Sequence, residues 1–408
     1  MNWLKNRPSP ESAARFLGLM LIAWQPFWSG ARLPAVLLAL LAAWLLLRRR
    51  LDFGAASSRR LGVVFLLLGV PVLLSMPHSF NVEASLYVAL ALGLFYWIGL
   101  ALLHGLRTQG DRDWLLHWLL LVFLAWTADG YLQYLFGRDL LGHALTPDRR
   151  IVGVFAGNLH LGLFLAVLLP AVLWPLAKRR PLATLAAAAA GGFVVAMSGS
   201  RSSILLLLLG GALLLTRLDR RYRLPLALAI LAISAGVALL SPAILQRIQF
   251  VAQTPASASA FERIDVVLSH RLTIWHNATT MVAERPLTGV GANAFAEAYP
   301  HYAPPDDFFL NHQKIYHAEQ MYVSVMAESG LPGLAGLLAA VALGAAWFLR
   351  APPERRRRAA PFAAPLAMIA FPLQSQPVLY TIWWFPVVLL LLCGVLAALD
   401  ERPEQRAE

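Results

Sequence analysis

Long apolar runs recur along the whole chain, and they limit the folds open to it more than any other feature of the sequence. Clear examples are residues 61–77, 86–106, 115–136, 159–176 and 224–240. Runs of about 17–25 residues match the length of a helix that crosses a hydrocarbon core of about 30 Å. Inside lipid, each run must satisfy its own backbone hydrogen bonds, so each is expected to be a helix. The sequence therefore predicts an all-α, polytopic integral membrane protein in a lipid bilayer.

The composition agrees with this interpretation. Hydrophobic residues make up 59% of the 408 residues and charged residues 14%, whereas soluble domains are roughly half apolar and a quarter charged. We expect about twelve transmembrane helices, with a large, partly helical loop between spans 9 and 10. The candidate spans are 13–29, 33–47, 61–77, 85–106, 114–136, 153–176, 182–199, 202–216, 224–245, 320–349, 360–378 and 379–398. The predicted organisation is 1–245 for spans 1–9, 246–318 for the loop, 319–400 for spans 10–12 and 401–408 for a tail.

The basic residues predict the orientation of the chain. The formal net charge is +12, from 34 Lys and Arg against 22 Asp and Glu. In a soluble chain this charge would suggest a nucleic-acid partner, but here the basic residues lie largely in short loops between apolar runs, so no nucleic-acid partner is expected. Placing both termini in the cytoplasm puts 24 of the 34 basic residues on that side, as the positive-inside rule requires. Half of the ten external ones lie between residues 246 and 316, and Arg201 stands alone, which indicates either an anionic ligand or simple solvation.

The long external loop is typical of a functional segment. Loops of more than about 15 residues are usually functional or disordered, and this one is too aromatic and too apolar to be mainly disordered. Apolar residues at helical spacing predict a helix over 264–283. Turn structure is expected from Pro286 to Gly291, because glycine accepts backbone angles that other residues avoid. The single cysteine, Cys393, lies in the last apolar run, which excludes a metal cluster held by thiolates.

Four motifs, all expected on the external side, give the chain a family resemblance. They are Gly153-Val-Phe-Ala-Gly-Asn158, Ser198-Gly-Ser-Arg201, Arg271-Leu-Thr-Ile-Trp275 with Pro286-Leu-Thr-Gly289-Val-Gly291, and His317-Ala-Glu-Gln-Met-Tyr322 with Ala327-Glu328-Ser-Gly330. In order and spacing this set resembles the bacterial O-antigen ligase family, which shares its signature with O-antigen polymerases and some protein O-oligosaccharyltransferases. The chain departs from the family at Glu319 and Gln320, where the family often has His and Asn. His317 is therefore the only histidine of its motif.

The resemblance implies an activity and its setting. It implies an inverting, metal-independent glycosyltransferase without a cofactor, at the periplasmic face of the bacterial inner membrane. The donor would be a glycan on undecaprenyl pyrophosphate, and for a ligase the acceptor would be a sugar hydroxyl of the lipid A core. A polymerase or a protein O-oligosaccharyltransferase would use the same donor. A flippase or transporter of the glycan is the non-enzymatic alternative, but it predicts internal repeats, and none is evident in the sequence.

Three arginines are candidate ligands of the pyrophosphate. A guanidinium presents a planar fork of donors to phosphate oxygens and would stabilise the negative charge that develops on a departing phosphate. Arg201, between two apolar runs, either binds this group or extends to water at the membrane interface. Arg271 either forms the second contact or stacks on Trp275, which is counted as a supporting residue. Arg263 either assists or pairs with its acidic neighbours, Glu262 and Asp265.

The remaining candidates concern proton transfer and support. His317 is the predicted base, since an imidazole with a pKa of about 6.5 is largely neutral at pH 7 and can accept the proton of an acceptor hydroxyl. Otherwise it is a polar loop residue bonded to backbone. Glu319 either orients His317 or caps the next helix. Glu328 either contacts substrate or pairs with an arginine. Asn158 either supports the site or joins two helices, and the role of Asp129 is left open.

Overall fold

The computed structural model of the protein describes residues 9–27, 30–156, 159–240, 259–311, 315–374, 379–381 and 383–400, together with 249 and 251–252. Within these residues the regular secondary structure is helical, and a single isolated bridge joins Arg138 to Ala144. The predicted all-α fold class is confirmed for this part of the chain.

The α-helices range in length from 4 to 30 residues. Those before residue 250 are α1 (Pro10–Ala23), α2 (Arg32–Leu47), α3 (Ala56–Ser75), α4 (Val82–Gly105), α5 (Gln109–Phe136), α6 (Leu161–Leu173), α7 (Leu176–Arg179), α8 (Pro181–Met197), α9 (Arg201–Arg217) and α10 (Arg220–Leu240). The later helices are α12 (Ala260–Val267), α13 (Arg271–Glu284), α14 (Phe295–Tyr302), α15 (Phe308–Asn311), α16 (Met321–Arg350), α17 (Pro353–Ile369) and α18 (Phe385–Asp400). Two short 3-10 turns are η2 (Met76–His78) and η3 (Gly153–Phe155).

Local sequence signals set the ends of several helices. α5 begins at a capping box, in which the Thr108 and Asp111 side chains bind each other's backbone amides. It ends at Gly137, whose φ of 78° lies in the left-handed region that favours glycine after a helix. The same capping box, formed by Ser259 and Glu262, begins α12. Polar residues therefore extend α5 beyond the apolar run from which the span 114–136 was predicted.

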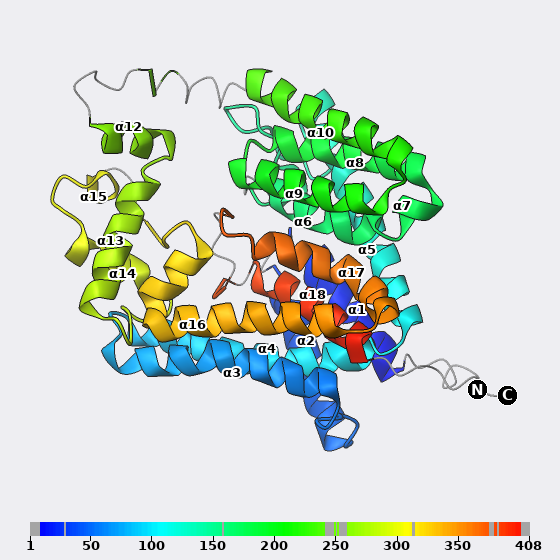
Figure 1. The fold of residues 1–408 in the computed structure, drawn as a ribbon, viewed down its shortest axis with the longest axis horizontal. Coiled ribbons are helices and arrows are strands. Elements are labelled where there is room, and N and C mark those ends of the chain that lie inside the picture. The colour runs from blue at the N-terminus through cyan, green and yellow to red at the C-terminus, as the bar shows by residue number, and fades with distance from the viewer. Residues whose placement is uncertain are drawn as a thin grey trace.

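Contacts between helix ends show that the long helices run between two ends of the molecule. At one end, the Ser57 hydroxyl at the start of α3 donates to the Asp400 carboxylate at the end of α18 (2.8 Å). At the other end, the Arg285 guanidinium after α13 donates to the carbonyl of His78, just beyond α3 (2.7 Å). Helices α3, α4 and α16 run alongside one another between these ends, and α12 to α15 gather at the second end (Figure 1).

Several helices have the length and apolarity of membrane spans. In the described chain, four segments are long and apolar enough to cross a membrane, namely Ala56–His78, Val82–Gly105, Gln109–Phe136 and Met321–Arg350. The shorter helices α2, α6, α8 and α18 are also apolar. The protein is thus a helical membrane protein, while the count of about twelve spans stays a prediction. The predicted start of span 153–176 is wrong, because Gly153–Phe155 form the turn η3 and α6 begins only at Leu161.

Residues 259–311 and 315–320, called the polar region below, fold around a small core of their own. This core includes Ile274 of α13, Phe295 of α14 and Phe309 of α15, all of them buried. The single helix predicted over 264–283 is wrong near its start, because the chain breaks between α12 and α13. Ser269 and His270 lie in this break with φ of 57° and 58°. The break presents backbone groups that a continuous helix would bind internally.

Candidate functional site

A break in α16 joins this helix to the polar region. Gly330 has φ 68° and ψ −170°, so the helical path is interrupted one third of the way along. The Val290 amide donates instead to the carbonyl of Ala327 (2.9 Å). A Cβ at Gly289 would lie 2.4 Å from that carbonyl oxygen, so only glycine fits there. The Pro286–Gly291 and Ala327–Gly330 motifs, separate in the sequence, therefore form one backbone joint.

A row of three side chains lies beside the start of α16. It consists of Arg271 from α13 and of Glu319 and His317, which precede α16 in the sequence. The Arg271 guanidinium lies 3.4 Å from Oε2 of Glu319, and Nδ1 of His317 lies 3.6 Å from Oε1 of the same carboxylate. The Glu319 amide also donates to Nδ1 (3.3 Å). The capping alternative for Glu319 is wrong, because Gln320 is the N-cap and its side chain accepts from the Val323 amide (2.7 Å). Glu319 instead faces the imidazole of His317, and the alternative in which it orients this ring stays a prediction.

Trp275, on α13, ties this helix to the segment that carries His317 and Glu319. Its indole Nε1 donates to the carbonyl of Ala318, between the histidine and the glutamate, at 2.9 Å. The Ala318 amide in turn donates to the Ser324 hydroxyl on the first turn of α16 (3.2 Å). The segment that carries His317 is thereby held from both sides.

The surroundings of His317 favour its neutral form. Burial lowers the pKa of the imidazole below its ordinary value, and the nearby Arg271 charge lowers it further, whereas the Glu319 carboxylate raises it. The net direction is downward. A neutral imidazole has a lone pair available for a proton at neutral pH, which is the state a general base requires.

A cavity of about 180 Å³ opens beside His317, between the polar region and α16. His317, Glu297, Ser324, Glu328 and Tyr380 are among the residues that line it. The Glu328 carboxylate is 4% exposed, and its Oε2 accepts from the backbone amide of Asn293 (2.9 Å). The alternative in which Glu328 pairs with an arginine has no counterpart among the described residues.

Arg201 contacts the break between α12 and α13 rather than the cavity. It is the first residue of α9, after the cap Ser200. Its guanidinium donates to the carbonyl of Val267 (3.0 Å) and to the hydroxyl of Ser269 (2.8 Å), two residues before Arg271. The structure thus brings Arg201 to the chain segment that leads into Arg271. Arg271 in turn lies near His317, through their shared neighbour Glu319. Neither arginine is among the residues that line the cavity.

Arg150 is a neighbour of the Ser198–Arg201 turn that the sequence patterns did not indicate. Its side chain lies against Gly199, where a Cβ would come within 2.8 Å of Arg150 Cδ. Gly199 has φ 69°, so the turn needs glycine for its conformation as well as for this contact. Nε of Arg150 lies 2.5 Å from Oδ2 of Asp148, and the guanidinium is mostly buried. The available signal was the group of charged residues at Asp148–Arg150, in a loop predicted to be external, but these residues follow no recognisable spacing.

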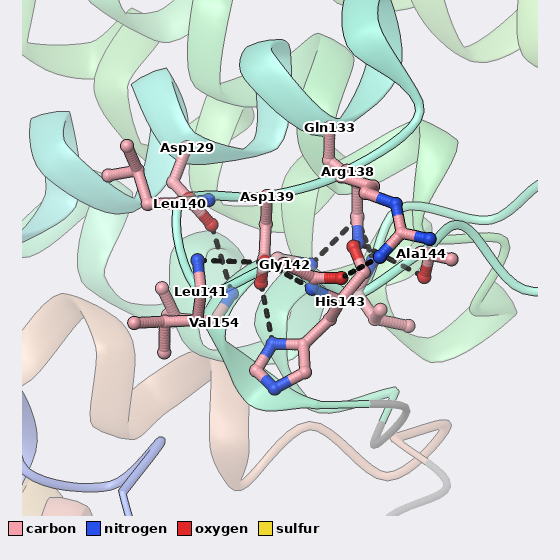
Figure 2. Close-up of polar contacts among 12 residues, drawn as sticks. Asp129, Gln133, Arg138, Asp139, Leu140, Leu141, Gly142, His143, Ala144 and Val154 are labelled. Atoms are coloured by element: carbon pink, nitrogen blue, oxygen red, sulfur yellow. Dashed lines mark hydrogen bonds and ion pairs between the residues drawn. The ribbon is translucent and has the colours of Figure 1, made fainter.

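Asp129, whose role was left open, holds the loop that leads to Arg150. Its two carboxylate oxygens accept from the amides of Leu140 and Val154, both at 2.9 Å (Figure 2). One turn along α5, the Gln133 side chain accepts from the amides of Val152 and Gly153 at 2.8 Å and donates to the carbonyl of His143 at 3.0 Å. These buried side chains replace the hydrogen bonds that the loop backbone lacks, so their role is structural.

Two predicted residues lie apart from this arrangement. Arg263 is exposed on α12 and does not line the cavity. Of its two predicted partners, Glu262 binds the amide of Ser259 in the capping box (2.6 Å), and Asp265 accepts from the Thr273 hydroxyl (2.6 Å). Asn158 lies outside the described residues.

These features define a helical membrane protein with a polar, cavity-bearing site where its helices meet a separately folded region. The family model described as O-antigen ligase matches residues 184–338 of the chain. The matched stretch is similar to this family, and it includes Arg201, Arg271, His317, Glu319 and Glu328. A search of curated proteins finds no match to the chain.

Proposed function

We propose that the protein is an O-antigen ligase, an inverting glycosyltransferase of lipopolysaccharide assembly. It would move O-antigen polysaccharide from undecaprenyl pyrophosphate to a sugar hydroxyl of the lipid A core, at the periplasmic face of the inner membrane. The observation that supports this proposal is the row Arg271–Glu319–His317 beside a cavity, within the stretch that matches the O-antigen ligase family model. Cation, carboxylate and imidazole are the groups that this transfer needs.

In the proposed reaction, the acceptor oxygen attacks the anomeric carbon of the donor sugar. The hydroxyl proton passes to the imidazole of His317, the new carbon–oxygen bond forms, and the bond from the anomeric carbon to the pyrophosphate oxygen breaks with its electron pair leaving on that oxygen. His317 becomes an imidazolium, whose positive charge lies beside the Glu319 carboxylate, 3.6 Å from Nδ1. The negative charge of Glu319 stabilises this imidazolium, so the carboxylate favours the proton transfer.

The arginines supply the positive charge that the leaving pyrophosphate requires. Arg201 is bonded to the turn that precedes Arg271, so the two guanidinium groups belong to adjoining parts of the same surface. Fixed positive charge at the departing oxygens stabilises the transition state and acts in place of a metal ion. Arg263 lies on α12, one helical turn before Val267. In the proposed reaction it would be an outer contact for the same anion. Trp275 and Glu319 support Arg271 and His317 through the contacts described above.

The alternative activities differ in the acceptor. An O-antigen polymerase would pass the glycan to another lipid-linked repeat unit, and a protein O-oligosaccharyltransferase would pass it to a serine or threonine. A flippase or transporter would move the lipid-linked glycan without transferring it to any acceptor. A lipopolysaccharide gel from a deletion strain separates these possibilities. Loss of a ligase leaves unmodified core and polymer on the lipid carrier, whereas loss of a polymerase leaves core with a single repeat unit.

The substitution His317→Ala tests the proposed base. General base catalysis contributes about 10²–10⁴-fold to a rate, so we expect transfer by the purified protein to fall by that factor while its abundance in the membrane is unchanged. His276→Ala is the matched control, because this histidine is exposed on α13 in the same region. Full activity of the His317 variant would remove the imidazole from the mechanism.

A further inference from the structure

The break between α12 and α13 has a backbone conformation that side chains disfavour. Ser269 and His270 have φ values of 57° and 58°, in the left-handed region that residues other than glycine rarely adopt. Two such residues in succession persist only where neighbouring groups hold them. The break lies directly before Arg271, the first residue of α13. The groups that hold the break therefore also determine where the Arg271 side chain begins.

Asp265, on α12, reaches across this break to α13. Its carboxylate is buried, and Oδ1 accepts from the Thr273 amide (3.1 Å). Oδ2 accepts from the Thr273 hydroxyl (2.6 Å) and from Nδ1 of His270 (3.2 Å). The carbonyl of Asp265 accepts from the His270 amide (2.7 Å). One residue of α12 thus binds both the break and the first turn of the next helix.

These bonds make Asp265 the cap of α13, although it lies five residues before the cap position. His270 occupies that position and makes no side-chain cap bond. Thr273 is the third residue of α13, and its amide is one that an N-cap side chain normally binds. The His270 ring is also stacked on Phe308 of α15, with the ring centroids 4.1 Å apart. The direction of the turn that carries Arg271 therefore depends on Asp265.

We propose that Asp265 is a positioning residue for the donor pyrophosphate, and that it acts by holding Arg271 and Arg201 at one rigid break. The proposal rests on the glycosyltransferase function proposed above. Arg201 binds the break from α9, through the carbonyl of Val267 (3.0 Å) and the hydroxyl of Ser269 (2.8 Å). Asp265 does not itself bind the anion, because its carboxylate would repel it. Without Asp265 the break relaxes, and the two guanidinium groups lose their fixed separation.

The test measures donor binding and transfer by the full-length protein in lipid nanodiscs. In Asp265→Ala, we expect the Kd of undecaprenyl pyrophosphate and the KM of the lipid-linked donor to rise about tenfold, since misplacing a positioning group by about 1 Å can cost roughly 100-fold in rate. The KM of the lipid A-core acceptor should stay at its wild-type value. Thr273→Val, which removes one of the bonds to Asp265, should raise the donor KM in the same direction but less.

Asp307→Ala is the matched control for a purely structural effect. Asp307 is also a buried carboxylate of the polar region. It accepts from the Asn277 side chain at the middle of α13 (3.0 Å) and from the Tyr299 hydroxyl (3.1 Å), away from the first turn. We expect this variant to lower the apparent melting temperature while the donor Kd and both KM values stay unchanged. Loss of folded protein alone lowers the rate and leaves the KM values as they are.

A double-mutant cycle tests whether Asp265 acts through the arginine. In an Arg271→Ala background, Asp265→Ala should change the donor Kd by about twofold or less, because residues that act together are not additive. A full effect in that background, or a wild-type donor Kd and KM in both Asp265→Ala and Thr273→Val, would overturn the positioning role. A wild type that binds undecaprenyl pyrophosphate but transfers nothing refutes the proposed function alone, since the Kd comparison still decides the role of Asp265. A wild type that does not bind this carrier overturns both.

Discussion

Glu319→Gln tests whether this carboxylate acts on His317 through its charge. The replacement amide has the same shape, so the change removes the charge and leaves the packing in place. In the wild type, the carboxylate lies 3.6 Å from Nδ1 of His317 and 3.4 Å from the Arg271 guanidinium. The three side chains are 20–31% exposed, so water screens these interactions in part.

The expected size of the effect follows from these distances. At such a separation two unit charges interact by roughly 1 kcal/mol in bulk water and by roughly 4–5 kcal/mol at an effective dielectric constant of about 20. Partial exposure puts the imidazolium–carboxylate attraction near the lower end, at about 1–2 kcal/mol. Because the imidazolium forms as the acceptor loses its proton, we expect kcat/KM at neutral pH to fall roughly tenfold.

The pH dependence gives a second readout with a definite sign. Glu319 raises the pKa of His317 against the downward effects of burial and of Arg271. Removing the carboxylate therefore lowers the pKa further. The base is active when neutral, so the acid limb of the kcat/KM profile moves to lower pH. Glu284→Gln is the control, with the same charge change at a side chain that is 59% exposed, and it should keep the wild-type acid limb and rate. An acid limb that stays in place, with a rate within about twofold of the wild type, would refute the role assigned to Glu319.

Two more substitutions test the framework of the site. Gly330→Ala forces a Cβ to within 2.7 Å of the Pro286 carbonyl oxygen at a φ of 68°, so we expect a loss of about 1–3 kcal/mol in stability and a lower apparent melting temperature. Gly344→Ala on the same helix has nothing within 4 Å and should not lower it. Gln133→Leu leaves two buried loop amides without an acceptor, and we expect a loss of about 2–3 kcal/mol; an unchanged melting temperature would contradict the role assigned to Gln133.

Hydropathy predicted the helices well where the chain is uniformly apolar, and less well where polar groups set the ends. The span predicted at 320–349 is α16, Met321–Arg350, almost unchanged. The span predicted at 360–378 is α17, which begins earlier, at Pro353, and ends at Ile369. Glu354 and Arg358, one helical turn apart, form an ion pair that stabilises this charged first part of α17 (2.6 Å). A search for apolar runs cannot detect a helix whose first residues are charged.

The candidate site was predictable in its residue types but not in its contacts. Motifs indicated His317, Glu319 and Arg271, yet their row depends on the bond from Trp275 to Ala318, 43 positions away in sequence. No periodic pattern encodes a contact of that kind. Arg150 was missed for the same reason, since its importance comes from packing against a turn that lies about 50 residues further along the chain.

The joint between α16 and the polar region explains why two distant motifs must occur together. Pro332 has no backbone N–H, so the carbonyl of Glu328, four residues earlier, lacks its usual helical donor. The Gly291 amide supplies the missing bond at 2.9 Å, and the Leu331 amide donates outward to the carbonyl of Pro286 at 2.8 Å. These bonds fix the position of the polar region along α16, and with it the separation between Glu328 and His317. A proline in the helix and glycines in the loop thereby determine how the face of α16 that lines the cavity meets the polar region.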